Sequence, residues 1–245
     1  MKPPLRDRLF GALLLVPFAL AIAWLHFGRG VPFVSFIYGS GSWGFGCILK
    51  MLIYHTVIRK LRHDEASILR VSLLNGLVSG ITELGLALLF FVFLKQLTFG
   101  QVVAFGIGIG TIEAYLVATP SHPLKGTALE TASRQLEATV ERLPDNRRWI
   151  YQVAMPIAER LIATGIHIGT RGLVYVSWRS GGPLPFLFAL LIFLVADGVL
   201  GYRLLHQGKL ADLRVLNRTY ASLLGLAVLA LAGFLYAWDA GAGPG

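Results

Sequence analysis

The sequence predicts an all-α, polytopic membrane protein with about seven transmembrane helices in one bundle. The chain has 245 residues, of which 55% are hydrophobic and 14% are charged. Soluble domains carry about 25% charged residues. Mean hydropathy is +0.66, and uncharged runs recur at the length of about 20 residues that crosses a bilayer. Together these observations exclude an ordinary soluble domain.

The apolar runs give the expected spans in chain order, within one integral membrane domain that covers residues 1–245. Each run reaches or exceeds the length of about 20 residues that crosses the hydrocarbon layer. The expected spans are residues 9–27, 34–57, 71–94, 97–118, 149–178, 184–206 and 217–238.

Basic residues set the expected orientation, because Lys and Arg gather in cytoplasmic loops. Sixteen of them fall in the N-terminal tail and the second, fourth and sixth loops, against three in the first, third and fifth loops. This asymmetry predicts a cytoplasmic N-terminus and an external C-terminus. The expected location, a bacterial inner (plasma) membrane, is a separate expectation that the loop charges do not give. The asymmetry also accounts for the net charge of +9 without nucleic acid as a partner. A cleavable signal peptide is the alternative for the first span; its removal would leave six spans and the same loop orientation.

The long fourth loop contains a segment with helical periodicity over residues 127–143. Leu129, Leu136, Val140 and Leu143 recur on one face at the spacing of a helix. We expect a cytoplasmic amphipathic helix that lies on the bundle or on the membrane surface.

Four acidic residues fall inside the predicted spans: Glu83, Glu113, Glu159 and Asp197. Charged groups at this depth are costly, so each one is either part of a functional site or part of an ion-pair network that fixes helix packing. In the third span, Glu83 lies on a polar stripe with Ser72, Asn75 and Ser79, whose spacing of 3, 4 and 4 residues places them on one helix face. Such a stripe faces protein or water rather than lipid.

The fifth span carries a second polar stripe. Arg160, Thr164, His167 and Arg171 are spaced 4, 3 and 4 residues apart, and Glu159 lies beside Arg160. A single interior histidine is more often a hydrogen-bonded core residue than a metal ligand. Two arginines on the same stripe favour a functional site at His167. They also make a bound metal cation less favourable by charge repulsion, unless the glutamates neutralise them.

The fourth span contains the string FGIGIGTIEAY. Gly106 and Gly110 form a small-xxx-small pair, which lets another helix approach closely, and Glu113 follows near the same face. The alternating glycines lack the Lys-Ser/Thr of a phosphate loop, which excludes nucleotide binding by that motif. Cys47 is the single cysteine, which excludes an internal disulfide framework.

Three strings, in order and within residues 71–206, resemble the YhfC-like membrane proteins: SGITELGLALLFF, FGIGIGTIEAYLVA and AERLIATGIHIGTRGLV. That family is grouped with the CAAX-protease and bacteriocin-processing (CPBP) intramembrane proteases, the PrsW proteins and the scaffold subunit of gamma-secretase. The resemblance implies a hydrolase that cleaves a peptide bond within or beside a membrane helix. It implies catalytic roles for Glu83, Glu113, Glu159, Arg160 and His167.

Two mechanisms are open under this resemblance. In the first, His167 and Glu83 help to hold a divalent metal such as zinc, which normally takes three protein ligands. In the second, no metal is used, and Glu83 acts as the base that activates water while His167 orients it. Asn75 or Arg171 would then donate to the oxyanion. Either mechanism requires Glu83, Glu113 and His167 to converge on one cavity, with Glu83 and His167 in direct or one-water contact.

The sequence departs from the family pattern at three places. Leu84 follows Glu83 where the pattern has a second Glu and then an Arg, Ile109 stands where it has a His between the glycines, and Ile192 or a neighbour stands where it has another His. We therefore expect a diverged member, either weakly active or inactive with a helix-binding or scaffold role. Its expected partners are membrane lipid and a transmembrane peptide or protein substrate.

Two other functions remain open. Intramembrane carboxylates and arginines also mark the ion path of a small transporter or channel, although no inverted repeat is evident. A purely structural bundle is the third possibility, in which Glu159 would pair with Arg171, or Asp197 with Arg160.

Overall fold

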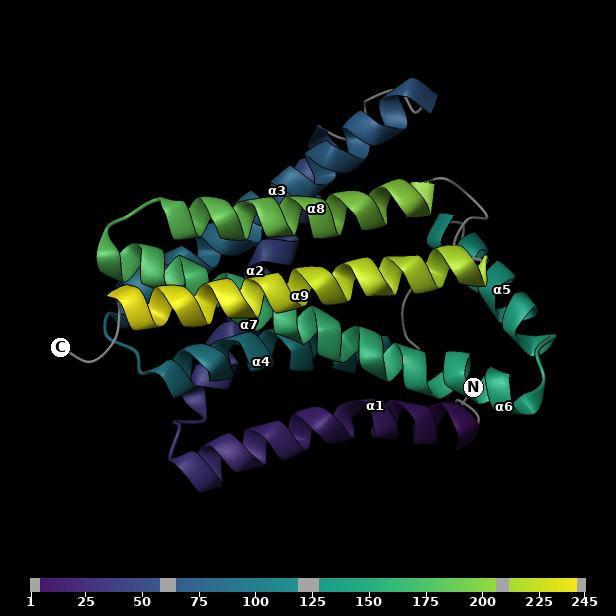
Figure 1. The fold of residues 1–245 in the computed structure, drawn as a ribbon, viewed down its shortest axis with the longest axis horizontal. Coiled ribbons are helices and arrows are strands. Elements are labelled where there is room, and N and C mark those ends of the chain that lie inside the picture. The colour runs from purple at the N-terminus through teal and green to yellow at the C-terminus, as the bar shows by residue number, and fades with distance from the viewer. Residues whose placement is uncertain (1–4, 58–64, 119–127, 206–211, 242–245) are drawn as a thin grey trace.

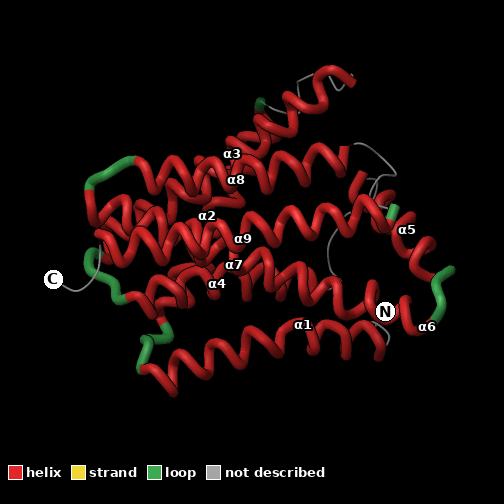
Figure 2. Tube along the Cα trace, viewed as in Figure 1, coloured by secondary structure: helices red, strands yellow, loops and turns green. Residues whose placement is uncertain are grey.

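The computed structural model describes residues 5–57, 65–118, 128–205 and 212–241. In these ranges every regular element is a helix, and Figures 1 and 2 show long helices joined by short loops. The prediction of an all-α protein is therefore confirmed for the described part of the chain. The elements are α1 (Leu5–Ala23), η1 (Trp24–Gly28), α2 (Val34–Thr56), α3 (Glu65–Leu94), α4 (Phe99–Ala118), α5 (Ala128–Glu141), α6 (Asp145–Trp149), η3 (Ile150–Ala154), α7 (Met155–Ser180), α8 (Leu184–Leu205) and α9 (Leu213–Gly241).

Five described helices are long and apolar enough to cross a bilayer. The apolar stretches are Gly11–Gly28, which runs through α1 and η1, Val34–Thr56, Ile68–Leu94, Phe99–Ala118 and Leu213–Ala240. Helix α8 adds a shorter apolar stretch, Leu184–Leu200. Helix α7 is 26 residues long but carries the charged stripe. The molecule therefore has the form of a multi-pass membrane protein.

Large apolar side chains cover the outside of the bundle. Phe27, Phe93 and Leu184 are 84%, 75% and 76% exposed. Soluble monomers rarely expose large continuous apolar surface. A surface of this kind suits contact with lipid chains.

Helix α7 occupies the interior of the bundle, where it packs against α3, α4, α8 and α9 (Figure 1). Its residues Arg171 and Val174 have no exposed surface. A π-helical turn, Ile150–Ala154, leads into it, and Pro156 follows just after this turn. The stripe residues Arg160 and Arg171, whose side chains are 17% and 1% exposed, therefore face protein, as the sequence predicts.

Glycines on α4 bring it close to its neighbours. A Cβ added to Gly106 would lie 2.6 Å from Ile168 Cα of α7, and one added to Gly110 would collide with the Thr164 side chain. The predicted small-xxx-small pair is therefore a helix contact. Gly108 faces the Phe36 backbone of α2 in the same way, so α4 is held between α2 and α7.

Aromatic side chains fill the end of the bundle where α3 meets α4. The ring centroids of Phe91 and Phe105 are 4.8 Å apart, those of Phe91 and Tyr175 are 5.4 Å apart, and those of Tyr175 and Trp238 are 5.7 Å apart. The Tyr175 hydroxyl donates to the Leu97 carbonyl at 2.9 Å and accepts from the Leu97 N–H at 2.8 Å. The Tyr175 side chain thus fixes the loop between α3 and α4.

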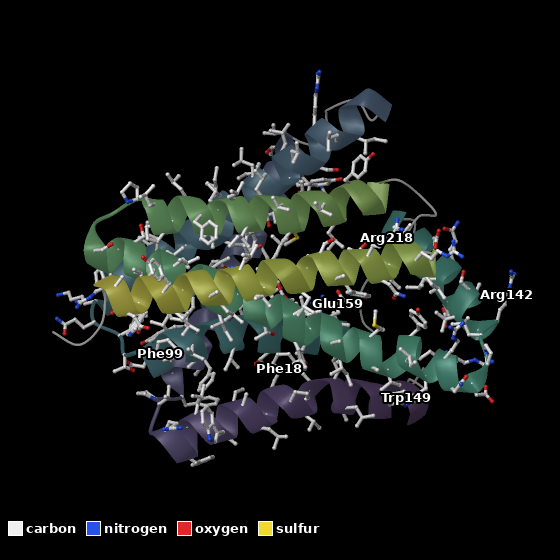
Figure 3. The ribbon with its side chains drawn as sticks, viewed as in Figure 1. Phe18, Phe99, Arg142, Trp149, Glu159 and Arg218 are labelled. Carbon is white, nitrogen blue, oxygen red and sulfur yellow. The ribbon has the colours of Figure 1, made fainter. Side chains whose placement is uncertain are left out.

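Helix α5 covers Ala128–Glu141, close to the predicted segment 127–143, whose first residue lies outside the described residues. Arg148 of α6 donates to the Glu141 and Leu143 carbonyls at 3.0 and 3.1 Å. These bonds satisfy carbonyl groups that the end of α5 leaves free. Figure 3 shows Arg142, Trp149 and Arg218 at this end of the bundle, with Phe99 toward the opposite end.

Candidate functional site

A cavity of about 200 Å³ lies among α2, α3, α4, α7, α8 and α9. All the residues that the sequence predicts as catalytic line it, and Figure 3 shows one of them, Glu159, between α7 and α9. The predicted convergence of Glu83, Glu113 and His167 on one cavity is therefore confirmed. The lining consists of Trp43, Cys47, Lys50, Glu83, Glu113, Glu159, Arg160, Ile162, Ala163, Ile166, His167, Phe193, Ala196, Asp197, Leu200 and Leu223.

The deepest charges are Glu83 and Arg171. Arg171 Nη2 donates to Glu83 Oε2 at 2.8 Å, and Ser79 Oγ donates to Glu83 Oε1 at 3.0 Å. The guanidinium also lies over the Phe193 ring, 4.8 Å from its centroid, a favourable cation–π arrangement. Both carboxylate oxygens of Glu83 therefore have partners. Gly46 of α2 provides the space, since a Cβ there would lie 3.2 Å from Glu83 Cγ.

Lys50 links this pair to Asp197. Its Nζ donates to Ser79 Oγ at 2.6 Å and to Asp197 Oδ2 at 3.2 Å, and lies 4.0 Å from Glu83 Oε1. The ammonium group thus has three oxygens around it, contributed by α3 and α8. These contacts join α2 to both helices.

His167 and Arg160 share Glu113. His167 Nε2 lies 3.1 Å from Glu113 Oε1, and Arg160 Nη1 donates to Glu113 Oε2 at 3.4 Å. The other ring nitrogen, His167 Nδ1, is buried without a hydrogen-bond partner among the described groups. The side chains of His167 and Glu113 are 7% and 16% exposed, so this part of the network is nearly sealed.

Glu159 completes the network at the boundary between α7 and α9. Arg160 Nη2 donates to Glu159 Oε1 at 2.5 Å, and the Tyr220 hydroxyl donates to Glu159 Oε2 at 3.3 Å. Arg160 therefore bridges two carboxylates. Because Glu159 is 33% exposed, it is the most accessible carboxylate of the cavity.

Two predicted ion pairs are wrong, and Glu83 and His167 make no direct contact. Within the described residues no hydrogen bond joins Glu83 to His167, since each has another partner; a contact through one water stays a prediction. Asp197 pairs with Lys50 rather than with Arg160 or Arg171, and Glu159 pairs with Arg160 rather than with Arg171. The physical reason is helix rotation: α7 points its 160 and 167 positions at α4 and its 171 position at α3. Sequence spacing fixes which residues share a face but not which neighbour that face meets.

Lys50 is the residue that the sequence analysis missed. It carries three of the contacts in the site. The signal was present, because Lys50 is the one Lys or Arg inside the predicted span 34–57.

The side chains present do not fit a catalytic zinc. The described part of the chain holds no group of three or more His, Cys, Asp or Glu side chains placed to bind a metal ion. His167 and Glu83, the expected ligands, have separate partners in Glu113 and Arg171. Instead, the carboxylates of Glu83, Glu113, Glu159 and Asp197 are paired with the side chains of Lys50, Arg160, Arg171 and His167.

Comparisons of the chain with protein-family models, curated proteins and solved structures found no match. What the cavity does is therefore inferred from its own side chains. Those side chains form a charge-paired, partly enclosed site inside the helical bundle.

Proposed function

We propose that the chain spans a bacterial inner membrane seven times, with its N-terminus in the cytoplasm. The five apolar helices support this topology, and α7 and α8 supply the two further spans if the polar face of α7 stays inside the bundle. The alternation of basic residues between loops gives the orientation. In this topology Glu113, Glu159, Arg160 and Asp197 lie in the cytoplasmic half of the membrane.

We further propose that the protein is a diverged member of the YhfC/CPBP-like, intramembrane-protease type. The support is that the three resembling strings meet in space. Glu83 from the first, Glu113 from the second, and Glu159, Arg160 and His167 from the third line the same cavity. Residues brought together from separate helices are what a site of this type requires.

The proposed role is to bind a polar segment of a membrane helix rather than to cleave it. The observation that carries this choice is that both oxygens of Glu83, Glu113 and Glu159 already have an arginine, hydroxyl or imidazole partner. A general base must be within hydrogen-bond reach of the water it deprotonates. These carboxylates face their cations instead, and His167 Nδ1 is buried.

A transport path across the membrane has less support. In the described residues the cavity does not continue past the buried pair Glu83–Arg171, because the aromatic cluster of Phe91, Phe105 and Tyr175 packs beyond it. A purely structural bundle is also less favoured, since close packing would leave no cavity of about 200 Å³ beside the charges.

The experiment that tests the proposed function compares hydrolysis with binding. A host that lacks the gene is complemented with the wild-type protein, with Glu113→Gln or with His167→Ala, and new protein N-termini in its membranes are mapped by mass spectrometry. Binding without cleavage predicts the same N-termini in all three. It also predicts that a photo-crosslinking amino acid at Leu223, in the cavity wall, gives a defined crosslink to the transmembrane segment of a membrane protein. An N-terminus that depends on both Glu113 and His167 would overturn the binding role in favour of proteolysis.

A further inference from the structure

The cavity has two facing walls that do not pack on each other. Helix α2 contributes Lys50 and Cys47 to one wall, and α8 contributes Phe193 and Asp197 to the other. Each of these helices packs along α3 rather than along its counterpart. Separating the walls would therefore break no extensive interface between α2 and α8 themselves.

One ion pair joins these walls. Among the described side chains, Lys50 and Asp197 form the ion pair that joins α2 to α8, with 3.2 Å between Nζ and Oδ2. Their side chains are 27% and 28% exposed, whereas those of Arg171 and Glu83 are 1% and 4% exposed. The pair thus lies at the boundary of the cavity, and the buried charges lie behind it.

The Lys50 ammonium group has other partners on α3 when its contact with Asp197 breaks. Ser79 Oγ is 2.6 Å from its ammonium group and Glu83 Oε1 is 4.0 Å away, both on α3. Asp197 is exposed enough to exchange its partner for water. Breaking the Lys50–Asp197 contact would therefore move Lys50 from α8 toward α3. Neither charge would then be buried without a partner, and a charge buried in that way is what makes breaking an ion pair costly.

We propose that Lys50 and Asp197 form a latch that controls access to the cavity between α2 and α8. Closed, the latch holds the walls together; open, it admits the polar segment of a membrane partner. The identity of what enters rests on the proposed function, whereas the latch itself does not. The two are tested by different measurements.

Cys47 reports on the latch because it is the only cysteine of the chain and lines the cavity. It lies one helical turn from Lys50, on the side away from the C-terminal end of α2. A water-soluble thiol reagent applied to the protein in detergent micelles, where both ends of the bundle are open to water, measures how readily water reaches this position. The labelling rate of the denatured protein gives the maximum.

The latch predicts slow labelling of Cys47 in the wild-type protein and faster labelling in both Lys50→Gln and Asp197→Asn. The increase should be about tenfold or more, the change expected when an open state populated to about 10% or less becomes the main state. The charge-swapped double variant Lys50→Asp/Asp197→Lys should return toward the slow rate. Arg218→Gln removes an exposed charge of α9, outside the cavity lining, and should leave the rate unchanged.

The two single variants change the local charge in opposite directions, so attraction of the reagent cannot speed both. Opposite effects on the rate, or no effect in either variant, would overturn the latch. So would wild-type labelling as fast as that of the denatured protein, which would show an open cavity. Thermal unfolding in detergent confirms that each variant is folded, and these outcomes do not depend on whether a partner helix or a cleaved peptide is later found.

Discussion

Arg171 Nη2 on α7 lies 2.8 Å from Glu83 Oε2 on α3, and both side chains are almost completely buried. Arg171→Met removes the cation and leaves the Glu83 carboxylate buried without its main partner. We expect the free energy of unfolding to fall by about 3–5 kcal/mol, the usual cost of breaking a buried pair from one side. Denaturant unfolding in mixed micelles measures this change.

Two further variants separate the ion pair from packing. Glu83→Gln combined with Arg171→Met removes both charges and should recover part of the lost stability, because neither charge is then left unpaired. Arg179→Met, at an exposed position in the last turn of the same helix, should change stability by less than about 0.5 kcal/mol. Equal losses for Arg171→Met and Arg179→Met would contradict a buried, stabilising pair.

The contact between His167 and Glu113 should appear as a coupling energy. A double-mutant cycle with His167→Gln, Glu113→Gln and the double variant isolates the pair, and contacting polar residues couple by about 0.5–3 kcal/mol. A matched cycle with His167→Gln and Glu83→Gln should give a smaller coupling, because those two side chains share no hydrogen bond in the described structure. If the second coupling is the larger, the pairing of His167 is misassigned.

Gly106 permits the close approach of α4 and α7. Gly106→Ala places a methyl group 2.6 Å from Ile168 Cα, and such overpacking costs about 1–3 kcal/mol. Gly85 on α3 is the matched control, because a Cβ there meets nothing within 4 Å. Gly85→Ala should therefore keep or raise stability, by up to about 1 kcal/mol from helix propensity. If Gly106→Ala and Gly85→Ala shift the unfolding midpoint by the same amount, a tight contact at Gly106 is ruled out.

The proposed topology predicts which loops face the cytoplasm. In a Cys47→Ala background, Arg179→Cys should react with an impermeant thiol reagent in intact cells. Arg142→Cys should react only after the membrane is permeabilised. Both positions are exposed in the structure. Labelling of both from the same side would refute the odd number of spans between them, and the reverse pattern would refute the orientation.

The sequence was sufficient to locate the site. Polar residues on single faces of apolar segments have to point inward, since lipid offers them no partner. That rule placed Glu83, Glu113 and His167 in the interior, and the cavity contains all three. The same rule predicted the buried face of α3, where Ser72 and Ser79 have no exposed surface.

The partners within the site could not be predicted in the same way. Arg171 is four residues from His167 on the same face, yet it contacts α3 while His167 contacts α4. That division depends on how α7 is rotated and on the glycines that set its distance from α4. Lys50 was overlooked because no other charged side chain in its span marks a polar stripe with it, and a lone lysine in a span is usually taken to reach the interface. Its role depends on Asp197, which is 147 positions away in the chain.

The order of the charges along the chain has a consequence for biogenesis. Glu83 and Glu113 are synthesised before Arg160 and Arg171, so α3 and α4 reach the membrane ahead of α7. An isolated α7 would insert poorly, because each central charge costs about 2.5–3.5 kcal/mol on the insertion scale. Its insertion becomes favourable when α3 and α4 are already in the membrane, because their carboxylates then pair with its arginines. In the proposed seven-span topology, the ion pairs of the cavity therefore also make the entry of α7 into the bilayer depend on helices made before it.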